Sequence, residues 1–205
     1  MISIPYGPRA AVVTIDLHRG HLDPRVATMP LPEAVAARVT KANAEFLREA
    51  RRRGLPVVHV VTGYRSVEEI SSNPWWAAVA DTSASRSNAL RHQLPGSPGL
   101  ELMPDVHDAG HDLVVTGKKR YDCFVATDLD HVLRSRGIDT LLLTGVNTNS
   151  CVLATTIAAN TRDYVPVVVR DCVDTMDPAL HDAALRVISQ AFGWVATAEE
   201  VLSAL

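Results

Sequence analysis

An acid, an amine and a thiol each follow a short apolar segment of this 205-residue sequence. Asp16, Lys118 and Cys151 come after the segments 10–15, 113–116 and 140–144, respectively. A cysteine acts as a nucleophile when a neighbouring cation stabilises its thiolate and a base accepts its proton. If the fold brings these side chains together, the thiol could attack a carbonyl carbon while Asp16 accepts the proton.

The apolar segments indicate the architecture that would position them. Six short runs, rich in β-branched residues and separated by helical stretches, span residues 10–15, 56–62, 113–116, 140–144, 165–169 and 193–197. Continuously apolar strands are typical of parallel sheets that helices cover on both faces. We therefore predict an α/β fold of three α/β/α layers with a mainly parallel, Rossmann-like six-stranded sheet. Such sheets bind ligands beyond the carboxyl ends of their strands, where the acid, the amine and the thiol would lie.

The spacing of apolar residues between the strands predicts the helices that form the outer layers of this fold. An apolar stripe over residues 35–50 stops before Gly54 and predicts an amphipathic helix. A second stripe consists of Leu180, Ala183, Ala184, Val187, Ile188 and Ala191, preceded by Asp177 as N-cap and Pro178 at the first helical position. A short helix is expected within residues 127–137.

The thiol is expected at the start of another helix. The loop 147–150 leads into a stripe of small residues suited to close packing on the sheet, namely Cys151, Ala154, Thr155, Ala158 and Ala159. A helix N-terminus favours the thiolate, and a nearby lysine would lower the pKa of Cys151 further. Backbone N–H groups at this position could also hold an oxyanion.

Residues 63–104 interrupt the alternation of strands and helices. This stretch contains Trp75 and Trp76 and is rich in serine, proline and glycine. Long irregular segments in compact domains tend to form lids or binding loops. We expect an excursion with partial helix, in which the tryptophans wall a pocket, seal an interface or simply pack.

Three sequence patterns occur together around the reactive residues. The first is an aspartate, Asp16, at the end of the first strand. The second consists of Lys118, Tyr121 and Phe124, and the third of Gly145, Thr148, Cys151 and Val152. The combination covers most of the chain and resembles the isochorismatase-like cysteine hydrolases. The resemblance implies a catalytic triad of Asp16, Lys118 and Cys151. It also implies a cis peptide bond between Val146 and Asn147, and an oxyanion hole formed by the backbone amides of Asn147 and Cys151.

The length of 205 residues predicts a single hydrolase domain over residues 1–205. The resemblance implies a homodimer or homotetramer, and we expect a small-molecule amide substrate and no cofactor. The run from Val146 to Val152 most resembles members that act on biuret and other carbamoyl or ureido amides. We therefore predict a cysteine-dependent amidohydrolase that works through a thioester acyl-enzyme. Two alternatives stay open: hydrolysis of another bond, such as the vinyl ether of isochorismate, and a catalytically silent binding domain on the same fold.

The histidines near Asp16 raise the alternative of a metal site. His18 stands where the family often has glutamine, and Asp16, His18 and His21 have a spacing typical of metal ligands. The nicotinamidase branch of the family holds a metal, but around the second strand, where residues 59–65 lack its acid-and-histidine cluster. We therefore expect no metal, and buried or loop histidines at His18 and His59. The sequence leaves open the roles of His18, His21, Arg120 and Cys123.

The composition disfavours several other classes of protein. Lys and Arg total 20 against 23 Asp and Glu, so there is no basic excess for binding nucleic acid. Three cysteines are too few for a disulfide framework, which favours a reducing, cytoplasmic environment. The N-terminal residues do not have the basic-then-apolar pattern of a secretory leader, so we do not expect secretion. The sequence also has no run of 18 apolar residues, so we do not expect a membrane partner.

Overall fold

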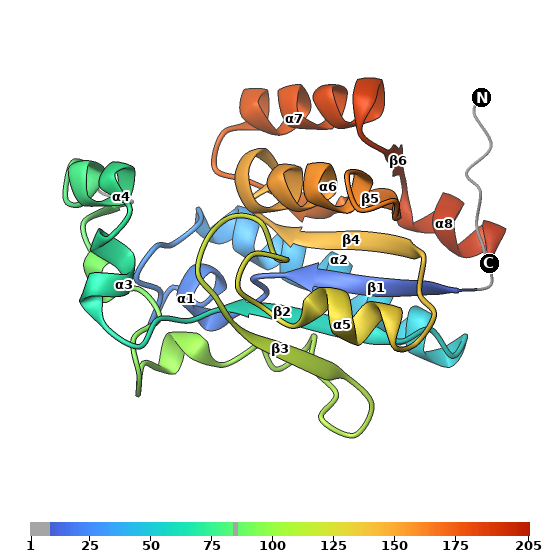
Figure 1. Ribbon diagram of the computed structural model, residues 1–205, viewed down its shortest axis with the longest axis horizontal. Coiled ribbons are helices and arrows are strands. Elements are labelled where there is room, and N and C mark those ends of the chain that lie inside the picture. Colours follow the sequence, from blue (N-terminus) through green and yellow to red (C-terminus); the bar gives the residue numbers. More distant parts are fainter. Residues whose placement is uncertain (1–8, 84–85) are drawn as a thin grey trace.

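The computed structural model, which describes residues 9–83 and 86–205, contains a six-stranded sheet (Figure 1). The strands are β1 (Ala10–Ile15), β2 (Val57–Thr62), β3 (Leu113–Lys118), β4 (Thr140–Val146), β5 (Val165–Asp174) and β6 (Trp194–Ala196). Their order is β3-β2-β1-β4-β5-β6, and every neighbouring pair is parallel. The predicted sheet is therefore confirmed, and its order reverses between β1 and β4, where open α/β sheets form their ligand crevice.

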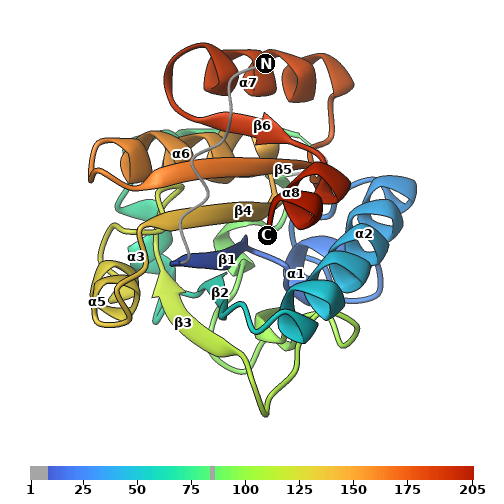
Figure 2. The same cartoon turned by 90° about the vertical axis from the view of Figure 1, so that its right-hand side faces the viewer.

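Helices cover both faces of the sheet (Figure 2). One face packs against α2 (Glu33–Arg52) and α8 (Ala198–Ala204), and the other packs against α5 (Leu129–Arg134), α6 (Leu153–Asn160) and α7 (Pro178–Ala191). This arrangement confirms the three-layer α/β/α fold.

Both faces of the central strands are apolar, which explains why their sequences do not alternate with polar residues. All six residues of β1 are buried. Val13 and Ile15 join the core under α5, α6 and α7, whereas Val12 joins the core under α2. Since a strand alternates sides, the continuous apolar run supplies two cores at once.

The predicted helices are present, with one error of orientation. The 35–50 stripe lies within α2, and the Asp177 side chain caps α7 by accepting a hydrogen bond from the N–H of Ala179. However, α7 buries Ala184, Leu185 and Ile188, while Leu180 and Val187 are 48% and 46% exposed. The predicted stripe is therefore partly wrong, because α7 packs on α6 and its neighbouring turn through a face centred on Leu185.

The excursion after β2 is built of short helical pieces, as expected. They are α3 (Val67–Ser71), α4 (Pro74–Val79), η2 (Ala89–Arg91) and η3 (Pro98–Leu100). Together with α1 (Arg19–Leu22), α3 and α4 lie beyond the carboxyl ends of the strands (Figure 1). Across the described residues, the helices are too short or too polar to cross a lipid bilayer.

Candidate active site

Asp16 directly follows β1 and points into the carboxyl edge of the sheet. Its side chain is fully buried, and its φ of 54° places it in the left-handed region that few non-glycine residues adopt. The carboxylate is held in this position by β2: Oδ1 accepts hydrogen bonds from the Thr62 N–H at 3.0 Å and from the Thr62 hydroxyl at 2.8 Å. Asp16 therefore caps no helix, because Oδ1 is bonded to Thr62 of β2 and Oδ2 to Lys118 of β3.

Lys118, the last residue of β3, brings a buried ammonium to the same place. It lies opposite Thr62 in the β2–β3 register. Its Nζ donates to Asp16 Oδ2 at 2.6 Å, to the Thr62 hydroxyl at 2.8 Å and to Cys151 Sγ at 3.4 Å. One cation thus contacts both the acid and the thiol, and all three side chains are at least nine-tenths buried. The structure brings together the three residues that the sequence singled out, and their catalytic roles remain a prediction.

Cys151 lies in a turn of π-helix, η4 (Thr148–Val152), that continues into α6. The expected α-helical first turn is therefore wound more widely, a feature often found at functional sites. The peptide bond between Val146 and Asn147, just before this turn, is cis. At Gly145, φ is 107°, and a Cβ atom would lie 2.0 Å from the Ile15 carbonyl oxygen. Only glycine lets β4 approach the end of β1 this closely, which positions Cys151 beside Asp16.

The charges of the three groups are set by burial and by one another. Burial alone would raise the pKa of the Asp16 carboxyl, but the Lys118 ammonium holds this pKa well below its usual range. Burial alone would lower the pKa of Lys118, and the Asp16 and Cys151 charges raise it instead. For the thiol, burial dominates over the favourable effect of Lys118 and raises the pKa of Cys151 to about 11.

The prediction of a lowered thiol pKa is therefore wrong for the resting site. Lys118 does lower the pKa of Cys151, as expected, but the desolvation of the buried thiolate raises this pKa by more than Lys118 lowers it. The resting pair is a neutral thiol beside an ionised aspartate, so a proton must leave Cys151 before it can attack a substrate.

A pocket opens over these residues at the carboxyl edge of the sheet. Its wall includes Tyr64 from β2's end, Trp76 from α4 and Tyr121 from the segment after β3. The rings of Trp76 and Tyr121 stack with centroids 5.9 Å apart, and the guanidinium of Arg86 lies 5.3 Å from the Trp76 ring centroid. Trp76 therefore walls the pocket, whereas Trp75 is 62% exposed.

Two arginines also line this pocket, and their hydrogen bonds differ. Arg120 donates to the Lys119 and Glu69 carbonyl oxygens and to the Ser72 hydroxyl, so it braces the excursion. Arg86 Nη1 is buried and has no hydrogen-bond partner among the residues that the structure describes. Of the two, Arg86 is therefore better suited to bind a substrate.

The remaining cysteines and one histidine belong to the core. Cys123 and Cys172 are free, buried thiols whose pKa values are raised by burial, and Cys123 packs among apolar side chains. His59 is buried in β2, where it hydrogen bonds to the Thr14 hydroxyl at 2.6 Å and to Asp112 at 2.9 Å. The expected core roles of Cys172 and His59 are confirmed.

Sequence reasoning missed two site residues. Thr62 is predicted only to end the second strand, although its position at the carboxyl edge of the sheet is a signal for a partner of Asp16. Arg86 stands in the irregular excursion, where no periodicity indicates which side chains turn inward.

The sequence model of the Isochorismatase domain matches residues 10–200 of the chain. The chain belongs to the isochorismatase family. This assignment confirms the resemblance based on Asp16, the lysine motif and the cysteine motif, and it makes the protein a member of a family of hydrolases.

Two curated members of the family are amidohydrolases. The chain is 34% identical over 178 residues to the ureidoacrylate amidohydrolase RutB of Methylobacterium radiotolerans, a match covering 83% of the chain and 67% of the relative. It is 27% identical over 202 residues to the maleamate amidohydrolase of Pseudomonas putida, covering 98% and 89% of the two chains.

Solved structures share the fold along nearly the whole chain. An isochorismatase family protein from Burkholderia thailandensis superposes with a TM-score of 0.77 at 33% identity and covers 99% of both chains. The N-carbamoylsarcosine amidase from Thermoplasma acidophilum superposes with a TM-score of 0.73 at 27% identity, covering 93% of this chain and 97% of the other.

Proposed function

We propose that this protein is a cysteine-dependent amidohydrolase that cleaves a small linear amide, preferably a ureido or carbamoyl compound. The observation that carries the proposal is the position of Lys118, whose buried Nζ lies 2.6 Å from the Asp16 carboxylate and 3.4 Å from the Cys151 thiol. An acid, a cation and a nucleophile at the base of a pocket have the arrangement that covalent amide hydrolysis needs.

In the first half of the reaction, the Asp16 carboxylate accepts the Cys151 proton and the thiolate attacks the amide carbonyl carbon. The backbone N–H groups of Asn147 and Cys151 stabilise the negative oxygen of the tetrahedral intermediate. The C–N bond then breaks as protonated Asp16 returns the proton to the leaving nitrogen. The products of this half are ammonia or an amine and a thioester on Cys151.

In the second half, water replaces the amine as the nucleophile. Asp16, again ionised, removes a proton from the water as its oxygen attacks the thioester carbonyl. The S–C bond breaks, the acid product leaves and the proton returns to the Cys151 sulfur. Lys118 keeps its charge throughout, so it steadies the thiolate and orients Asp16 without itself donating a proton.

The preference for ureido and carbamoyl amides has support from the comparisons. Among the relatives are a ureidoacrylate amidohydrolase and an N-carbamoylsarcosine amidase, whose names place a carbamoyl nitrogen on the substrate. Biuret is a neutral member of the same chemical class and therefore a useful test compound.

One feature of the pocket supports a substrate that carries a carboxylate as well as an amide. Arg86 Nη1 is buried, and a guanidinium suits a carboxylate because its N–H groups match the two oxygens. We expect ureido acids and N-carbamoyl amino acids to be better substrates than biuret. Arg86→Met should raise KM for the acids by tenfold or more and leave KM for biuret within about twofold.

The proposal is tested by ammonia release from biuret, ureido acids, N-carbamoyl amino acids, nicotinamide and maleamate. We expect release from a ureido or carbamoyl compound, loss of release in Cys151→Ala and normal release in Cys172→Ala, whose thiol lies in the core. Normal turnover by Cys151→Ala would refute the covalent mechanism. No release from any compound by the folded wild-type protein would refute the substrate class and favour a binding domain.

The expected homodimer or homotetramer and the cytoplasmic location remain predictions. Light scattering coupled to gel filtration measures the mass in solution. A mass of one chain of 22.2 kDa at working concentration would contradict the oligomer.

A further inference from the structure

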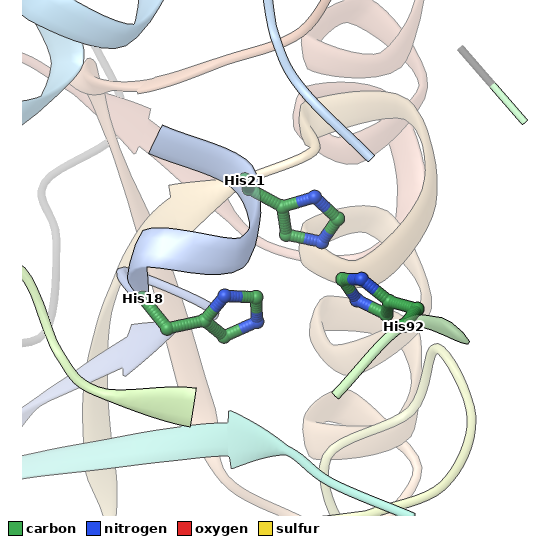
Figure 3. Close-up of side chains that lie close together, drawn as sticks. All are labelled: His18, His21 and His92. Carbon is green, nitrogen blue, oxygen red and sulfur yellow. The ribbon is translucent and has the colours of Figure 1, made fainter. Parts of the chain in front are cut away.

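Three buried histidines face one another beside the active site (Figure 3). His18 precedes α1 as its N-cap, His21 lies within α1, and His92 directly follows η2 in the excursion. One ring nitrogen from each residue lies within 4.8 Å of the other two. The three side chains are 0%, 7% and 4% exposed, respectively, so they form a cluster that water barely reaches.

The approach of His92 to the other two is built into the backbone. The next residue, Gln93, packs on α1 at Gly20, where a Cβ atom would lie 2.4 Å from Gln93 Oε1. Gln93 is held there by hydrogen bonds from its Nε2 to the Gly99 carbonyl at 2.8 Å and from the Tyr64 N–H to its carbonyl at 3.0 Å. A glycine thus lets the excursion dock against the turn that carries His18 and His21.

Hydrogen bonds leave ring nitrogens free to face the centre of the cluster. His21 Nδ1 lies 2.8 Å from the Met29 carbonyl oxygen, and a carbonyl can only accept, so this nitrogen carries the proton. The Nε2 of His21 therefore keeps its lone pair. His92 Nδ1 lies 2.8 Å from the Thr28 hydroxyl, which can accept a hydrogen bond from it and leave the lone pair on Nε2. Such bonds to the outer nitrogen are how proteins orient metal-binding histidines.

His18 supplies an independent sign of a missing ligand. Neither of its ring nitrogens has a hydrogen-bond partner among the residues described in the structure, although the side chain is fully buried. Nε2 makes an ion-pair contact with Asp16 Oδ1 at 3.5 Å, which is too long for a strong hydrogen bond, and that oxygen is already bonded to Thr62. Buried side-chain nitrogens without any hydrogen-bond partner are rare in folded proteins, because desolvation is then uncompensated, and such a group points to an additional ligand.

We propose that His18, His21 and His92 bind one divalent transition-metal ion of the zinc class. Three neutral imidazoles are the donor set of many zinc sites, with a fourth position left open. Here His21 and His92 line the same pocket as Asp16 and Cys151, so the open position faces the substrate space.

Binding requires a modest closure of the three rings. Nitrogens bound at about 2.1 Å in a tetrahedral arrangement lie roughly 3.4 Å apart, so a pair at the 4.8 Å limit must approach by about 1.4 Å. Side-chain rotation can supply this movement, because His18 has no hydrogen bond to break among the described residues. The ion would polarise or orient an oxygen or nitrogen donor in the pocket. Its binding does not depend on the proposed amidohydrolase activity.

Metal content and affinity test the proposal without an activity assay. The full chain is stripped with a chelator, reloaded with Zn²⁺ or Co²⁺, and studied by elemental analysis, titration calorimetry and the visible spectrum of the cobalt form. We expect one ion per chain and the absorption of a tetrahedral cobalt site. Cys151→Ala should bind equally well, which separates this site from the thiol.

The variants are chosen so that folding and binding can be told apart. His92→Ala should weaken metal binding by at least 100-fold, and Thr28→Val, which removes only the bond that orients His92, should weaken it by about 10- to 100-fold. His111→Ala, at a histidine that is 75% exposed, should bind like the wild-type protein. Circular dichroism checks that each variant is folded.

Two results would overturn the proposal: less than 0.2 ion per folded wild-type chain after reloading, or a metal affinity that His92→Ala leaves within about threefold of wild type. Loss of ammonia release with metal binding intact would instead contradict the proposed function and leave this site in place.

Discussion

Thr62 gives a sharp test of how the site is held together. Its hydroxyl donates to Asp16 Oδ1 at 2.8 Å and accepts from Lys118 Nζ at 2.8 Å, so one small side chain bridges both buried charges. Thr62→Val keeps the shape of the side chain and removes both bonds. The backbone N–H of residue 62 still reaches Asp16 at 3.0 Å.

The expected loss follows from these two bonds. Hydrogen bonds to charged groups contribute about 1.5–3 kcal/mol each, so two of them sum to about 3–6 kcal/mol. Because the backbone N–H of residue 62 still holds Asp16, we expect Thr62→Val to lower the free energy of unfolding by about 3 kcal/mol, the lower end of this range. For a chain of this size, that corresponds to a fall in Tm of roughly 6–12 °C. Because Lys118 also loses an anchor near Cys151, kcat should fall by about tenfold or more with a smaller change in KM.

A matched control lies in β4, which is separated from β2 by β1. Thr144 in β4 is fully buried, and its hydroxyl has no hydrogen-bond partner within the described part of the chain. Thr144→Val should therefore change the free energy of unfolding by less than about 1 kcal/mol or increase it. Urea denaturation of both variants makes the comparison. A Thr62→Val variant as stable as wild type, or equal losses in the two variants, would refute this reasoning.

Three further predictions concern the thiol, the lysine and the approach of β4. Because burial raises the pKa of Cys151 to about 11, the rate of its alkylation by iodoacetamide should increase about tenfold per pH unit from pH 7 to 10. A rate that reaches a plateau by pH 8 would show that the thiol pKa is lowered instead. Lys118→Met leaves the Asp16 charge buried and unpaired, so it should lower the free energy of unfolding, measured by urea denaturation, by about 3–5 kcal/mol and abolish ammonia release. A variant as stable as the wild-type protein would contradict the buried ion pair. Gly145→Ala would place a Cβ atom 2.0 Å from the Ile15 carbonyl oxygen and should lower the free energy of unfolding by more than about 4 kcal/mol. Gly54 also has a positive φ but has open space around it, so Gly54→Ala should lower the free energy of unfolding by only about 1–2 kcal/mol. Equal losses in the two variants would refute the steric argument.

The sequence predicts the sheet and the three reactive residues well because both depend on strands. Continuous apolar runs identify parallel strands, and residues just after such strands must meet at one edge. Asp16 and Lys118 could therefore be placed together although 102 positions separate them. The cysteine motif then placed Cys151 at the same edge.

Features that depend on how elements rotate or dock were harder to predict. The exposed side of α7 carries Leu180 and Val187, so apolar spacing alone misjudged its inward face. His92 joins His18 and His21 only because the excursion docks at Gly20, which no periodic pattern indicates. The thiol pKa was misjudged for a different reason, since helix position and charge were considered without the depth of burial.

In the proposed mechanism, Cys151 carries the acyl group during amide hydrolysis. The most direct measurement is intact-protein mass spectrometry after rapid acid quenching of wild-type protein mixed with its best ureido or carbamoyl substrate, followed by peptide mapping. We predict one added acyl mass per chain on the peptide containing Cys151, present in Cys172→Ala and absent in Cys151→Ala. Turnover without any adduct under single-turnover conditions, or an adduct on another residue, would contradict the account.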